Sequence, residues 1–150
     1  MKTLYESILD NEDVLVRNIK KDSKNPFALL DALLNQHGEN LNAIPEKMIN
    51  EIVELLKLPK TMKIEPRCSK LTYWREQSIT LYDKYSRTIA WFVIDKDSII
   101  FDIGFRGKSH EDLFGGKKEW ESYIKDVLIK EFNLTMPNKT YMYLLKYKRK

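Results

Sequence analysis

The stretch of residues 104–109 comes closest to a known chemical motif. Gly107, Lys108 and Ser109 match the end of the Walker A loop, which wraps nucleotide phosphates in backbone N–H groups. The full motif needs a glycine five positions before Gly107, but Asp102 stands there, and its carboxylate would repel phosphates. We therefore predict no nucleotide-hydrolysing site.

The same loop runs on to Gly115 and Gly116, just before the last predicted helix. Ser109 and Asp112 resemble a capping box, in which side chains bind the free N–H groups at a helix start, and we prefer this interpretation. The alternative is that backbone N–H groups after the glycines hold an anion. The basic residues nearby in sequence are Arg106, Lys108, Lys117 and Lys118.

Residues 141–150 interleave tyrosines with basic side chains. Aromatic rings stack on bases while lysine and arginine follow phosphates, so this segment is a candidate for binding single-stranded nucleic acid. The basic residues that we assign to this surface are Lys146, Lys148 and Arg149. We favour an ordinary final strand whose tyrosines pack under the helix of Trp120 and whose charged end stays in solvent.

The histidines and the single cysteine form no complete catalytic or metal-binding motif. His110 and Glu111 begin like a zinc-protease motif, but Phe114 occupies the place of the second histidine. His37 reads as a capping residue at the end of a leucine-rich helix. Cys68 is the single cysteine of the chain, so it has no disulfide partner, and we interpret it as an idle or buried cysteine. We predict no catalytic residue, metal or cofactor, although an unrecognised enzyme site near His110 stays open.

The composition predicts a folded domain in a reducing compartment. Of the 150 residues, 43% are hydrophobic and 11% aromatic, which is too much apolar material for a disordered chain. The net charge of +4 is uneven, about −2 in residues 1–60 and +6 in residues 61–150, which favours an anionic partner for the second half. The lone cysteine, and the absence of an export signal or a membrane-spanning run, predict a cytoplasmic protein with no membrane contact.

The first third of the sequence predicts a layer of helices within residues 1–58. Apolar spacing predicts helices near residues 11–21, 25–38 and 45–58. The second has the clearest ends, because Asn25 suits the N-cap, Pro26 suits the first turn and Gly38 stops the helix.

After Pro59 the apolar period changes from that of a helix to that of a strand. We expect an antiparallel meander centred on residues 78–105, with strands at 70–74, 78–82, 88–94 and 98–105. A helix at 117–131 and a final strand at 140–147 follow. Together these make one α+β domain of residues 1–150, in which residues 62–150 form the sheet and its helix.

The strand at residues 88–94 is apolar on both faces and is expected to need cover on each. The helix from Lys117 can cover one face and the N-terminal helices the other. If those helices dock elsewhere, the uncovered face becomes the best candidate for a partner-binding surface.

Residues 4–10, Leu-Tyr-Glu-Ser-Ile-Leu-Asp, resemble the start of various small uncharacterised bacterial and phage proteins. The resemblance covers about the first tenth of the chain and implies at most a recurring attachment or assembly element. We therefore expect a non-enzymatic protein that binds another protein or itself. Nucleic-acid binding through the basic second half is the alternative.

Overall fold

The computed structural model describes residues 24–59, 63–71, 76–138 and 144–150. The helix expected at residues 11–21 and the segment at residues 4–10 lie outside this part. The helical elements are α2 (Pro26–Gln36), η1 (Leu41–Ala43), α3 (Glu46–Leu55), α4 (Lys108–Phe114), α5 (Lys117–Tyr123) and η2 (Ile124–Glu131). The strands are β1 (Glu65–Leu71), β2 (Glu76–Tyr82), β3 (Thr88–Ile94), β4 (Ser98–Asp102) and β5 (Leu144–Lys148). The predicted α+β class is confirmed.

Helix α2 begins and ends at the residues that the sequence indicates. The side-chain oxygen of Asn25 accepts a hydrogen bond from the backbone N–H of Phe27 at 2.9 Å, and Pro26 occupies the first turn. At the other end, Gly38 has φ +64°, a left-handed conformation that favours glycine. His37 is the C-cap residue, as expected.

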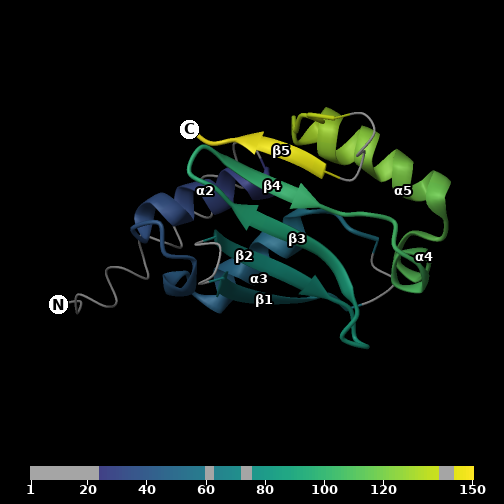
Figure 1. Cartoon of the computed structure of the whole chain (residues 1–150), viewed down its shortest axis with the longest axis horizontal. Coiled ribbons are helices and arrows are strands. Elements are labelled where there is room, and N and C mark those ends of the chain that lie inside the picture. Colours follow the sequence, from purple (N-terminus) through teal and green to yellow (C-terminus); the bar gives the residue numbers. More distant parts are fainter. Residues whose placement is uncertain (1–23, 60–62, 72–75, 139–143) are drawn as a thin grey trace.

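The five strands form one antiparallel sheet in the order β1-β2-β3-β4-β5, a meander (Figure 1). Residues paired across antiparallel strands share a face of the sheet. The register aligns Ile79 with Phe92, Phe92 with Phe101, and Phe101 with Leu145. All four side chains are fully buried, so this row crosses the apolar face of the sheet.

Helices α2 and α3 cover that apolar face and lie behind the sheet in Figure 1. Phe27 of α2 anchors the contact, with its ring centroid 5.4 Å from that of Phe92 and 5.5 Å from that of Phe101. It also stacks on Tyr147 of β5 at 6.0 Å with 27° between the rings. Tyr147 therefore packs against α2 and not, as expected, under the helix of Trp120.

Two strands, β1 and β4, differ most from their expected bounds. The first strand is Glu65–Leu71, earlier than the expected 70–74, and its Glu65 pairs with Tyr82 of β2. β1 is an edge strand that contains Pro66 and polar residues. It therefore lacks the apolar alternation from which a strand is predicted. The fourth strand ends at Asp102, where its pairings with Trp91 and Leu144 end, although apolar alternation continues to residue 105. The start expected for the last strand, residues 140–143, lies outside the described part.

The helical segment α5–η2 packs on the same side of the sheet as α2 and α3. The hydroxyl of Tyr123 donates to the carbonyl of Leu56, just after α3, at 2.7 Å. Phe132, which follows η2, contacts Phe27 at a centroid distance of 6.2 Å. The expected cover of both faces of β3 is therefore wrong for the part of the chain that the structure describes.

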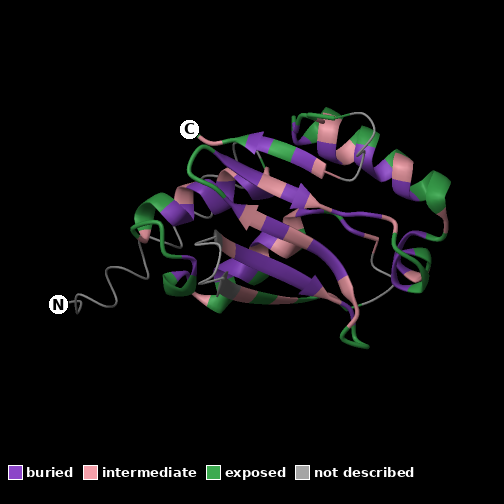
Figure 2. Cartoon of the chain, viewed as in Figure 1, coloured by how far each residue is buried: buried purple, intermediate pink, exposed green. Residues whose placement is uncertain are grey.

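One face of the sheet consequently faces the viewer in Figure 1 without a described helix over it. Figure 2 shows the inner strands β2, β3 and β4 banded between buried and half-buried residues, and exposed residues on the edge strands β1 and β5. We call it the open face, made by the side chains of Glu65, Arg67, Ser78, Thr80, Tyr82, Trp91, Val93, Ser98, Ile100, Asp102, Leu144, Lys146 and Lys148. None of the helices in the described residues is long and apolar enough to cross a membrane.

Candidate functional site

The centre of the open face is apolar. Val93 of β3 lies opposite Ile100 of β4, and Trp91 lies two residues before Val93 on the same side of β3. All three side chains are half-buried. Beside them, the short side chains of Ser78 and Thr80 on β2 are nearly buried between their larger neighbours. The result is an apolar strip bordered by small polar groups.

Basic side chains surround this strip. The register sets Arg67 of β1 beside Thr80, Lys146 of β5 beside Ile100, and Lys148 of β5 beside Ser98. Arg67, Lys146 and Lys148 are exposed. Two of the candidate basic residues of the C-terminal segment therefore lie on the open face.

Arg106 brings a third candidate residue to the same face. Its guanidinium carbon lies 4.8 Å from the centre of the Trp91 ring. The Nη2 atom donates to the two carboxylate oxygens of Asp102 at 2.9 and 3.0 Å. The arginine also crosses close over Gly104, where a Cβ atom would meet its Nε at 2.8 Å. Glycine at 104 therefore leaves room for the arginine to lie flat on the sheet.

His110 of α4 fixes the backbone at Arg106. The imidazole is buried, and its Nε2 lies 2.7 Å from the carbonyl oxygen of Ile89, which can only accept a hydrogen bond. Nε2 therefore carries the proton, and Nδ1 accepts from the backbone N–H of Arg106 at 3.1 Å. Burial is the main cause that lowers the pKa of His110, which favours this neutral form. With both nitrogens hydrogen-bonded, the ring has no atom available for proton transfer to a substrate.

The predicted capping box at Ser109 is wrong. Helix α4 begins at Lys108 after Gly107, so Ser109 already lies inside the helix, with its hydroxyl 3.3 Å from Nδ1 of His110. Asp112 instead pairs with Lys108 at 3.1 Å and with Arg87 at 3.1 Å. Hydrogen bonds from Lys108 and then Arg87 hold the pKa of Asp112 below its usual value. Lys108 thus belongs to an ion-pair cluster at the end of the sheet.

The glycines before α5 offer little room for an anion. A Cβ atom on Gly116 would lie 2.8 Å from a carboxylate oxygen of Glu119, so an acidic group already stands at this helix start. A carboxylate there interacts favourably with the helix dipole and repels a second anion. Lys117 and Lys118 are exposed in the first turn of α5, which lies beyond the edge of the sheet in Figure 1.

Arg149 lies on the other side of the sheet from Lys146 and Lys148. Its Nε donates to Asp31 of α2 at 2.7 Å, and its Nη2 pairs with Glu39 at 2.7 Å. The side chains of Arg149 and Asp31 are only 7% and 4% exposed. The guanidinium therefore joins the C-terminal end of the chain to α2 and is not offered to a ligand.

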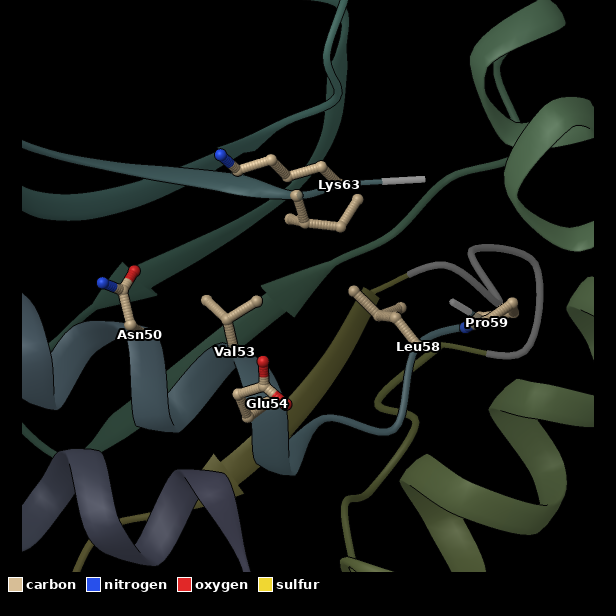
Figure 3. A pocket seen from close by; sticks show the side chains of 7 residues that line it. Asn50, Val53, Glu54, Leu58, Pro59 and Lys63 are labelled. Atoms are coloured by element: carbon tan, nitrogen blue, oxygen red, sulfur yellow. The ribbon is translucent and has the colours of Figure 1, made fainter. Parts of the chain in front are cut away.

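Besides a hollow of about 630 Å³ lined by α3 residues alone, two pockets lie between α3 and other elements. The first, of about 470 Å³, opens between α3 and the start of β1, and Figure 3 shows Asn50, Val53 and Glu54 on one side of it and Lys63 on the other. The second, also of about 470 Å³, has Cys68 in its wall. Burial, and to a lesser extent Glu46, raise the pKa of the Cys68 thiol, which keeps it protonated and poorly nucleophilic. No histidine is among the described residues that line either pocket.

Sequence reasoning missed the centre of the site. The alternation in β3 places Trp91 and Val93 on one face, but it does not show that this face lacks a helix. Arg67 and Ile100 join them only through cross-strand register. Across the described residues, no three His, Cys, Asp or Glu side chains gather as a metal site would require. No protein-family model, curated protein or solved structure matches this chain, so the open face is interpreted from its own chemistry.

Proposed function

We propose that this chain is a non-enzymatic binding protein that holds an acidic segment of another protein on its open face. The observation that carries the proposal is the half-buried strip of Trp91, Val93 and Ile100 inside a basic border. Protein interfaces commonly have an apolar centre and a polar rim, and Trp and Arg are enriched among the residues that dominate binding.

The charge of the border supports an acidic partner. Asp102 balances Arg106 and Glu65 balances Arg67 through ion pairs, whereas Lys146 and Lys148 add positive charge beside the strip. Two copies of the chain meeting through this face would bring these like charges together, which costs free energy. A different protein with carboxylates around an apolar group fits better.

Single-stranded nucleic acid would also be attracted to Lys146 and Lys148. Sequence-tolerant binding of single strands relies on aromatic faces on which bases stack. On the open face the Trp91 ring is already covered by Arg106 and the Tyr82 ring by Arg67, and Val93 and Ile100 are aliphatic. The apolar strip therefore favours a protein side chain over a base.

The candidate catalytic residues give an enzyme little support. Both imidazole nitrogens of His110 are used inside the fold, and the Cys68 thiol is held protonated. An unpaired thiol of this kind is usual in a reducing compartment, so we place the protein in the cytoplasm.

The test is a selection of random 16-residue peptides displayed on phage, carried out on the wild-type protein. Each selected peptide is then measured against Ile100→Glu, which puts a charge into the apolar strip, and against Glu54→Gln on the outer side of α3 as the control. We expect peptides rich in Asp and Glu with one or two large apolar residues. They should bind Glu54→Gln normally and lose binding to Ile100→Glu.

A parallel measurement uses a labelled 20-residue thymidine oligonucleotide at low salt. Salt-sensitive binding that disappears in Lys146→Ala and Lys148→Ala, with no peptide that depends on Ile100, would assign the face to nucleic acid and overturn the proposal. Peptides without acidic enrichment, or equally strong on Ile100→Glu, would also overturn it.

A further inference from the structure

The loop between β4 and α4 is attached to β3 at two points on either side of Ala90. His110 binds the carbonyl of Ile89, and the Arg106 guanidinium lies on the ring of Trp91. One attachment is buried and the other lies on the open face. The backbone N–H of Arg106 joins them, because it donates to Nδ1 of His110.

An irregularity in the sheet makes the carbonyl of Ile89 available to His110. The register pairs Leu81 with Ala90 and Tyr82 with Thr88, so Ile89 is skipped in the pairing of β2 with β3. A residue left out in this way is typical of a β-bulge and has a backbone group that the ladder does not use. Here the imidazole of His110 satisfies the carbonyl.

The two hydrogen bonds of His110 require a neutral ring. Nε2 must carry a proton to donate to Ile89, and Nδ1 must lack one to accept from Arg106. A proton added to Nδ1 would set two donors, Nδ1–H and the N–H of Arg106, against each other about 3.1 Å apart. Protonation therefore acts directly on the backbone that places the Arg106 side chain.

We infer that His110 is a pH-responsive positioning residue whose protonation releases Arg106 from Trp91 and so remodels the open face. Its consequence for partner binding rests on the proposed function, whereas the movement of Arg106 does not. Histidine is the side chain suited to such a switch, because its charge changes near physiological pH.

The charged groups around His110 come from every element packed against it. Asp102 of β4 and Asp83 of the β2–β3 turn favour the charged ring, whereas Arg106 disfavours it. On its own helix, Lys108 and Asp112 pair with each other, and Asp112 also pairs with Arg87. Burial outweighs the acidic groups and lowers the pKa below 6.5.

The direction of the pH effect follows from this shift. Above pH 6.5 the ring is neutral in both the folded and the unfolded chain, and both hydrogen bonds are intact. As the pH falls through the lowered pKa of the folded state, the ring takes up a proton and the bond to Arg106 is lost. The switch therefore operates at a pH below the usual pKa of histidine.

The test is a pH titration from 7.5 to 5 followed by 1H–15N NMR on the full chain without any partner. The readouts are the amide of Arg106, the indole N–H of Trp91 and the ring C2–H of His110, with the Trp91 signal assigned from a Trp91→Phe sample. We expect all three to move with one midpoint below 6.5. In His110→Gln, which keeps an N–H donor but does not titrate, the signals of Arg106 and Trp91 should stay in place.

His37→Gln serves as the control, because His37 caps α2 far from this loop in sequence and should leave the titration unchanged. The inference is overturned if His110 titrates in the wild type while the Arg106 and Trp91 signals stay fixed, or if His110 takes up no proton down to pH 5. This outcome is measured on the wild-type protein alone, so the test remains valid even if His110→Gln does not fold. Failure of the proposed function is read separately, from the peptide selection.

Discussion

The guanidinium of Arg106 lies 4.8 Å over the ring of Trp91, on the side of β3 that no described helix covers. This contact joins the open face to the loop between β4 and α4. The ring belongs to the apolar strip of the open face, and the arginine belongs to the loop that His110 fixes. A cation on an indole ring contributes about 0.5 to 1 kcal/mol when exposed, enough to hold a preferred geometry without locking it.

Gly104→Ala should displace Arg106 from Trp91. The new methyl group would lie 2.8 Å from Nε of the arginine, closer than the two atoms can approach. We expect a changed Trp91 indole signal and a loss of about 1 kcal/mol in the free energy of unfolding, the size of one cation–π contact. In an Arg106→Ala background, Gly104→Ala should leave the free energy of unfolding almost unchanged. An equal cost in both backgrounds would show that the methyl group clashes with something else.

Arg149→Ala should destabilise the fold far more than Lys148→Ala. Removing the arginine leaves the carboxylate of Asp31, on a side chain only 4% exposed, without its charged partner. Breaking such a buried pair costs about 3 kcal/mol or more, whereas an exposed lysine contributes within about 0.5 kcal/mol. Urea unfolding of the two neighbouring variants measures the difference. Equal stabilities would contradict a structural role for Arg149.

Phe27→Ala should remove the main contact between α2 and the sheet. The ring is fully buried and touches Phe92, Phe101 and Tyr147, so its loss leaves a cavity in the core. Such truncations lower the free energy of unfolding by about 3 to 5 kcal/mol, which urea unfolding measures. Tyr85→Ala is the matched control, because that ring is 63% exposed and should cost less than about 1 kcal/mol.

Asp83 should make the fold sensitive to acid. Burial tends to raise the pKa of this carboxyl, but hydrogen bonds from Arg87 and from the backbone N–H of Tyr85 hold it below 3.8. The carboxylate therefore stabilises the fold above pH 3.8, and this contribution is lost as the pH falls through the lowered pKa. Asp83→Asn should be less stable than the wild type at pH 7, and the gap should narrow towards pH 2. A gap independent of pH would rule out this role.

Local signals in the sequence were sufficient to predict the elements that depend on contacts between residues close together in the sequence. Asn25, Pro26 and Gly38 define α2 because a cap, a first-turn proline and a left-handed glycine act on the nearest backbone. The short polar connection at residues 95–97 predicted that β3 and β4 are antiparallel neighbours, as the register confirms.

Distant contacts could not be predicted in the same way. Arg149 looked like part of a basic surface because its partner Asp31 is 118 positions away in the sequence. Trp91 and Val93 looked like core residues because an apolar side chain gives no sign of whether a helix covers it. The strand β1 was placed too late because Pro66 and its polar neighbours make an edge strand without an apolar period.

The most direct test of the open face is the affinity of one selected acidic peptide for the wild type and for Ile100→Glu, by isothermal titration calorimetry at pH 7.5. Equal thermal unfolding temperatures first establish that both proteins are folded. A charge buried in the centre of an interface without a partner costs at least about 2 kcal/mol, so we expect Kd to rise by about 30-fold or more. A Kd that changes less than about twofold would contradict the assignment of the open face as the binding surface.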